Sequence, residues 1–147
     1  NRMIDNNLSD ENISFDVVNA ETLPYENNSF DYCTISFGIR NVPDKHKALE
    51  EIYRVLKPGG QFLCLEFSNV DNKLLRKLYD IYSFNAIPFF GQVITGSKES
   101  YEYLVESIRK FPDGETFRKM IEDAGFEQTS YEKLSNGVVA IHKAIKI

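Results

Sequence analysis

Two short polar stretches carry the side chains best suited to chemistry on a small molecule. Arg40 and Asn41 lie in residues 37–42, FGIRNV, directly after an apolar run, and the tripeptide Asn19-Ala20-Glu21 follows an earlier apolar run. A guanidinium group stabilises a neighbouring anion, and a side-chain amide donates and accepts hydrogen bonds without adding charge. Taken alone, an Arg-Asn pair is more often a solvated turn, and Asn-Ala-Glu is more often an Asx turn.

The first half of the chain alternates between strand and helix patterns. Apolar runs predict strands at residues 13–18, 32–37 and 61–67. Between the last two, Asp44 is a suitable N-cap for a helix whose apolar positions recur at helical spacing: Ala48, Leu49, Ile52, Val55 and Leu56. Pro58-Gly59-Gly60 ends that helix. The alternation predicts a parallel α/β sheet, and such sheets bind ligands at the carboxyl ends of their strands, where both polar stretches fall.

The second half predicts three helices and a hairpin. Helical spacing of apolar residues marks helices over residues 74–82, 101–111 and 117–124, the last of them stopped by Gly125. Asn136-Gly137 is the preferred pair for a type I′ turn, and it separates predicted strands at residues 129–134 and 138–144. The sheet is therefore expected to end in an antiparallel hairpin.

Composition narrows the class of protein. The 147 residues are 42% hydrophobic, which suits one domain over residues 1–147, and the net charge of -5 argues against a nucleic-acid partner. No apolar run is long enough to span a membrane. Cys33 and Cys64 lie in apolar runs and are expected to be free core thiols, which favours the cytoplasm. His46 is expected to face solvent and His142 to be structural, and the spacing of these Cys and His residues predicts no metal site.

Residues 19–68, residues 100–127 and the ending AIHKAIK together resemble the UbiE-type C-methyltransferases of ubiquinone and menaquinone biosynthesis. The resemblance implies a Rossmann-like class I methyltransferase sheet of strand order 3-2-1-4-5-7-6, closed by the C-terminal hairpin. The Gly-rich cofactor loop and the first strands of that fold have no counterpart, so we expect the C-terminal part of a longer domain, beginning in a helix tail at residues 1–8. The resulting gap is expected to close by pairing of residues 13–18 with residues 32–37, or to be filled by a second chain.

The resemblance also implies a reaction, the transfer of a methyl group from S-adenosylmethionine to a ring carbon of a polyprenyl quinol. The Asn19 side chain and the Ala20 backbone would contact the adenine, and Ser36 would approach the cofactor. Arg40 would stabilise the phenolate form of the ring, which supplies electron density to the attacking carbon, and Asn41 would orient the ring. Glu21 and Glu66 receive no catalytic role. The general base and the choice between benzoquinol and naphthoquinol stay open.

Residues 84–93, FNAIPFFGQV, have two interpretations of similar weight, a channel for the isoprenoid tail or a packed connector between helices. Contact with a membrane surface and a homodimer remain open as partners. Two alternative functions also remain: a methyltransferase of the same fold acting on another small molecule, and a non-catalytic fragment that serves as an assembly or lipid-binding partner. Cofactor binding would separate the second alternative from the enzymes.

Overall fold

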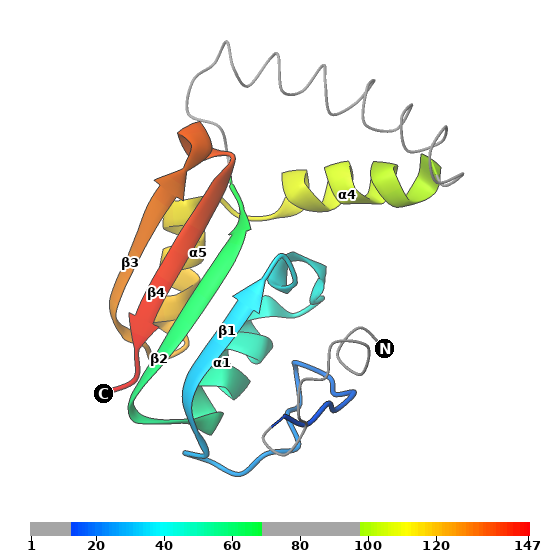
Figure 1. Ribbon diagram of the computed structural model, residues 1–147. Helices are drawn as coiled ribbons and strands as arrows, with labels where there is room; N and C mark the ends of the chain where they lie inside the picture. Colours follow the sequence, from blue (N-terminus) through cyan, green and yellow to red (C-terminus); the bar gives the residue numbers. More distant parts are fainter. Residues whose placement is uncertain (1–12, 69–97) are drawn as a thin grey trace.

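A four-stranded mixed sheet forms the centre of the computed structural model, which describes residues 13–68 and 98–147. The strand order is β1-β2-β4-β3 (Figure 1). β1 pairs with β2 in parallel, whereas β4 pairs with both β2 and β3 in antiparallel fashion. The strands are β1 (Phe30–Ser36), β2 (Leu56–Phe67), β3 (Glu127–Leu134) and β4 (Val139–Ile145). The predicted α/β sheet with a terminal antiparallel hairpin is confirmed.

Three α-helices accompany the sheet in the described residues: α1 (Lys45–Val55), α4 (Lys98–Lys110) and α5 (Gly114–Asp123). Figure 1 shows α1 and α5 behind the sheet, with α4 extending beside the end of β2. Each of these three helices was predicted from its apolar spacing. α1 begins as expected at the N-cap Asp44, whose carboxylate accepts a hydrogen bond from the Lys47 backbone N–H at 3.0 Å.

The hydrophobic core lies between the sheet and the two helices α1 and α5. The α1 side chains predicted to face inward are indeed buried, and Phe62 of β2 and Phe117 of α5 pack into the same cluster. Phe126, directly after α5, joins both Phe62 and Tyr53 through ring contacts of 5.6 and 5.1 Å between centroids. Aromatic and aliphatic burial of this kind supplies most of the stability of a small domain and fixes α1 against the sheet.

The hairpin turn lies at the predicted residues, but its loop is longer than predicted, because Val138 lies in the loop and the second strand begins at Val139. Asn136 has φ 56° and ψ 33°, and Gly137 has φ 87°, as the two central residues of a type I′ turn require. The Val138 N–H donates to the Ser135 carbonyl across the turn at 3.3 Å. The chain here forms the 3-10 turn η5 (Ser135–Gly137), and the β3–β4 ladder begins at the pair Leu134 and Val139.

The strand predicted at residues 13–18 is wrong. These residues are exposed and belong to no strand; the adjoining pairing is only an isolated bridge between Asn19 and Thr22. Within the described part of the chain, β1 pairs only with β2, so direct pairing of residues 13–18 with β1 is not formed either. A strand exists only when a neighbour takes its backbone hydrogen bonds, and no described strand pairs with residues 13–18. The Val17 side chain is therefore fully exposed instead of packing against a sheet.

Three expectations lie outside the described residues: the start of the chain at residues 1–8, the helix at residues 74–82 and the apolar segment 84–93.

The two cysteines are free thiols, as predicted. Cys33 lies on β1 and Cys64 on β2, where Cys64 is the register partner of Ile35. Burial raises the pKa of the Cys33 thiol to about 11, and it also raises the pKa of Cys64, assisted by the neighbouring charge of Glu66. Both groups therefore stay protonated at neutral pH.

A candidate active site at the ends of the parallel strands

The loop after β1 places Arg40 and Asn41 at the carboxyl end of the parallel strands. Phe37 turns the chain with a φ of 53°, and the single turn η3 (Ile39–Asn41) follows. Ile39 is fully buried and anchors this turn in the core. The anchor leaves Asn41 exposed and holds the Arg40 side chain against the sheet.

Arg40 forms an ion pair with Glu66 of β2. Its Nη1 lies 3.2 Å from Glu66 Oε1, and the two side chains are 9% and 0% exposed. Nη1 also donates to the Phe37 carbonyl, and the guanidinium carbon lies 5.4 Å from the centre of the Phe67 ring. The positive charge predicted at this position is thus present, but it is paired and partly covered by an aromatic ring.

Helix α4 contacts both residues of the Arg40-Asn41 pair. Arg40 Nε donates to Ser107 Oγ at 3.3 Å, and the Tyr103 hydroxyl donates to Asn41 Oδ1 at 3.1 Å. Ser107 is nearly buried, whereas Tyr103 is 57% exposed. One face of α4 therefore holds the loop after β1 from the side opposite to Glu66.

The Asn19-Ala20-Glu21 stretch forms a tight turn beside the start of α1. Asn19 Oδ1 accepts from the Glu21 N–H at 3.0 Å, which is an Asx turn, and the Asn19 carbonyl accepts from Thr22 N–H at 3.0 Å. Glu21 Oε1 in turn accepts from the Asp44 N–H at 2.9 Å, joining the turn to the N-cap of α1. Ala20 packs against the core. The Asx turn uses the side-chain oxygen of the exposed Asn19, and the side-chain NH₂ group of Asn19 takes no part in that turn.

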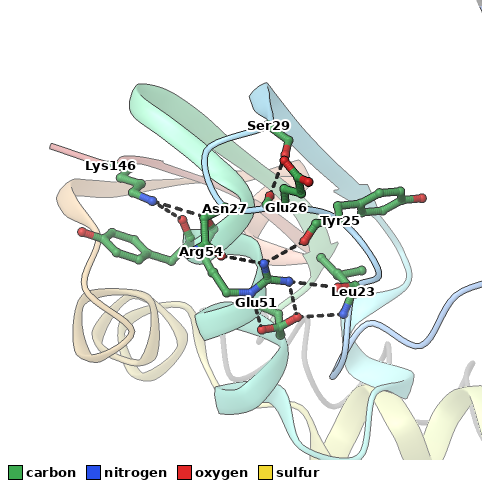
Figure 2. Close-up of polar contacts among 9 residues, drawn as sticks. Leu23, Tyr25, Glu26, Asn27, Ser29, Glu51, Arg54 and Lys146 are labelled. Carbon is green, nitrogen blue, oxygen red and sulfur yellow. Dashed lines mark hydrogen bonds and ion pairs between the residues drawn. The ribbon is translucent and has the colours of Figure 1, made fainter.

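A network centred on Arg54 of α1 holds the chain between this turn and β1 (Figure 2). Arg54 donates to the carbonyls of Leu23 and Tyr25 at 2.9 and 2.8 Å and to Asn27 Oδ1 at 2.8 Å. The Glu51 carboxylate accepts hydrogen bonds from Nε and Nη2 of Arg54 at 2.7 and 2.8 Å, and it also accepts from the Leu23 N–H. The hydrogen bonds from Arg54 lower the pKa of Glu51. The loop that leads out of the Asn19 turn is thereby fixed to α1.

The Arg40-Asn41 loop follows a strand, as predicted. The Asn19-Ala20-Glu21 turn does not, because residues 13–18 form no strand, and the partners of both stretches were not predicted. Ser36 is exposed at the end of β1, as expected of a residue at a strand end. Among the described residues, no hydrogen bond joins the Asn19 turn directly to Arg40 or Asn41; the start of α1 links them. Glu66 was assigned no catalytic role, yet it is the buried partner of Arg40. The available signal was an acid inside the apolar run of β2, because a buried carboxylate needs a partner.

Two residues outside the candidate pairs also have defined environments. His46 is exposed, as predicted, and His142 is 1% exposed on β4, where its Nε2 lies 2.9 Å from the Gly114 carbonyl. The structural interpretation of His142 is therefore confirmed. No helix in residues 13–68 or 98–147 is both long enough and apolar enough to cross a membrane.

The fold is that of class I S-adenosylmethionine-dependent methyltransferases. A solved S-adenosylmethionine-dependent methyltransferase from Thermotoga maritima superposes with a TM-score of 0.61 over 87% of this chain and 61% of its own, at 21% identity. At that identity the likeness concerns the fold alone. The strand order seen here is the 4-5-7-6 portion of the methyltransferase sheet.

The chain belongs to the ubiE/COQ5 methyltransferase family, whose model matches residues 1–146. It is 60% identical over 146 residues to a Rickettsia bellii protein named ubiquinone/menaquinone biosynthesis C-methyltransferase UbiE, covering 99% of this chain and 58% of the relative. It is also 60% identical over 128 residues to the mitochondrial 2-methoxy-6-polyprenyl-1,4-benzoquinol methylase of Bos taurus, covering 87% of this chain and 39% of that protein. The chain thus spans little more than half the length of the Rickettsia bellii relative and well under half the length of the Bos taurus protein.

Proposed function

We propose that residues 1–147 act as the C-terminal part of a single methyltransferase domain that methylates a ring carbon of a polyprenyl quinol with S-adenosylmethionine. The observation that carries this proposal is the ordered Arg40-Asn41 loop at the carboxyl end of β1, inside a chain of the ubiE/COQ5 methyltransferase family. The names of the Rickettsia bellii and Bos taurus relatives supply the reaction and the class of substrate.

In this proposal the exposed Asn19 amide and the Ala20 backbone receive the adenine, and Ser36 borders the cofactor. S-adenosylmethionine would supply the methyl group to the ring carbon and leave as S-adenosylhomocysteine, and the proton displaced from that carbon would pass to solvent water. Arg40 donates to the ring oxygen that has lost its proton, and Asn41 orients the ring. Because Glu66 already balances the charge of Arg40, the ring oxygen meets directed N–H groups rather than a net positive charge.

Three further expectations concern a membrane surface, the cellular compartment and a second copy of the chain. The polyprenyl tail of such a substrate would bring the protein to a membrane surface, and the free thiols suit a reducing compartment such as the cytoplasm. A second copy of the chain is one way to cover the edge of β1 that no strand in residues 13–68 or 98–147 pairs with, and sedimentation at increasing protein concentration would detect it.

The test requires a complete cofactor site, so this chain is joined to the preceding part of the Rickettsia bellii relative. Methyl transfer to demethylmenaquinol and to 2-methoxy-6-polyprenyl-benzoquinol is followed by mass spectrometry. Arg40→Ala is expected to lower turnover by ~100-fold, equivalent to about 3 kcal/mol for one lost donor, while the cofactor Kd stays within about twofold. Arg40→Lys is expected to restore little, since an ammonium lacks the planar fork.

Three outcomes would contradict parts of this proposal. If the joined enzyme methylates neither quinol, the reaction assignment is wrong. If Arg40→Ala keeps near-normal turnover, Arg40 has no part in the mechanism. Calorimetry on the 147-residue chain alone is expected to show weak cofactor binding or none, because two or three missing hydrogen bonds of ~1 to 1.5 kcal/mol each weaken binding by roughly 30- to 2000-fold. Micromolar binding by the chain alone would show that its own residues suffice.

A further inference from the structure

Glu66 is a fully buried carboxylate at the end of β2, and its hydrogen bonds come from the site loop. Its Oε2 accepts from the Arg40 backbone N–H at 3.3 Å, and its Oε1 accepts from the Phe67 N–H at 2.9 Å. Arg40 Nη1 reaches both oxygens, at 3.2 and 3.4 Å. A buried carboxylate is costly unless it is paired and hydrogen-bonded, and these contacts provide both conditions. Glu66 therefore fixes both the backbone and the side chain of Arg40.

The guanidinium group of Arg40 is held at two of its three nitrogens. Nη1 is bound to Glu66 and to the Phe37 carbonyl, and Nε is bound to Ser107 on α4. Nη2 makes no hydrogen bond to the part of the chain that the structure describes. Because the guanidinium is planar and rigid, two anchors on Nη1 and Nε leave the direction of Nη2 fixed as well.

We infer that Glu66 and Ser107 are positioning residues that direct Nη2 of Arg40 at the ring oxygen of the quinol. This inference rests on the proposed function, and it adds two residues to which the sequence analysis assigned no role. It also gives a role to the buried acid that lies next to Arg40, which in the proposed function binds the ring oxygen. Glu66 removes the rotational freedom of the guanidinium before substrate arrives, so the alignment costs nothing at the moment of reaction.

The first experiment follows Arg40 itself in the 147-residue chain. NMR of the ¹⁵N-labelled protein measures hydrogen exchange at Arg40 Nε–H in the unsubstituted chain, in Glu66→Gln and in Ser107→Ala. We expect exchange at least ~10-fold slower than for a solvated arginine, and loss of that protection in both variants. Glu115→Gln is the matched control, because Glu115 pairs with Arg118 on the exposed side of α5 at 2.8 Å. It should leave the Arg40 signal unchanged.

The second experiment measures kinetics in the joined enzyme. Glu66→Gln is expected to lower kcat by ~10- to 100-fold, as a misplaced catalytic group does, while the cofactor Kd stays within about twofold. Ser107→Ala is expected to lower kcat by a smaller factor, and Glu115→Gln to leave it unchanged. A purely structural Glu66 would instead change stability and leave kcat of the folded enzyme unaltered.

The outcomes separate this inference from the proposed function. A folded Glu66→Gln enzyme with kcat within twofold of the unsubstituted enzyme, or an unchanged Arg40 exchange rate, would overturn the inference. If Glu66→Gln does not fold, Ser107→Ala decides, since it removes one hydroxyl from the side of a helix. Failure of the unsubstituted joined enzyme to methylate any quinol would refute the proposed function, whereas the Arg40 exchange rates would still show whether Glu66 and Ser107 hold the guanidinium.

Discussion

Gly114, the first residue of α5, leaves no room for a side chain. A Cβ atom there would lie 2.6 Å from Cε2 and 2.9 Å from Cδ2 of Tyr131, well inside the usual separation of carbon atoms. Tyr131 stacks on His142 with 5.2 Å between ring centres, and His142 is bound to the Gly114 carbonyl. Gly114→Ala must therefore displace the Tyr131 ring or the start of α5, and either movement disturbs the contacts that join Gly114, Tyr131 and His142.

Two opposing effects set the magnitude of this change. Overpacking costs typically about 1 to 3 kcal/mol, whereas replacing Gly by Ala in a helix returns up to ~1 kcal/mol. We expect Gly114→Ala to lower the free energy of unfolding by about 1 to 2 kcal/mol, measured by urea denaturation. For a chain of this size that corresponds to a fall in Tm of roughly 3 to 6 °C.

Two controls identify the clash as the cause. Tyr131→Leu removes the ring, so Gly114→Ala should cost little in that background, and the double-mutant cycle should show a coupling of about 1 kcal/mol or more. Gly38→Ala should be nearly neutral, since its Cβ meets Ile35 at an ordinary 3.4 Å. A Gly114→Ala chain as stable as the original, or costs that simply add in the Tyr131→Leu background, would refute this reasoning.

Three further predictions concern pH, capping and the Figure 2 network. Burial lowers the pKa of His142, so as the pH falls the unfolded chain binds a proton at this residue before the folded chain does. The free energy of unfolding should therefore decrease as the pH drops below about 6.5 and become constant below the pKa of the folded chain. His142→Gln should abolish this pH dependence in urea titrations. Asp113→Ala removes the N-cap bond from the Thr116 N–H, 2.8 Å long, and should cost about 1 kcal/mol of unfolding free energy, whereas Asp113→Asn should cost little. Arg54→Lys cannot span its partners, so hydrogen exchange at Leu23 should accelerate; unchanged protection there would contradict the role of Arg54.

Local sequence patterns predicted most of the described fold, because helices and the hairpin turn depend on residues that are close together in the chain. Apolar spacing predicts α1, α4 and α5. Asn136 and Gly137 predict the hairpin, because both residues readily adopt the positive φ values that the turn requires. Residues 13–18 show where this approach fails. They are as apolar as a strand, but strand formation depends on a neighbour that the pattern of a single segment does not reveal.

The Arg40-Asn41 loop was predictable from the sequence, whereas its contacts and the surroundings of the Asn19 turn were not. Gly38 and the end of an apolar run indicate that Arg40 follows β1, and parallel strands place such loops at one edge of the sheet. The partners of Arg40 lie 26 and 67 residues further along the chain. No periodicity connects residues so far apart, so only the folded structure shows that Arg40 meets Glu66 and Ser107.

The two protonated thiols on β1 and β2 allow separation of these strands to be detected chemically. With a pKa of about 11, Cys33 is a thiolate in only about one molecule in 10⁴ at pH 7, and burial shields Cys64 further. A maleimide added to the folded chain should therefore react slowly until β1 and β2 separate. Alkylation followed by mass spectrometry would then count opening events of the strand pair that carries the site, in the unaltered sequence and without an introduced label.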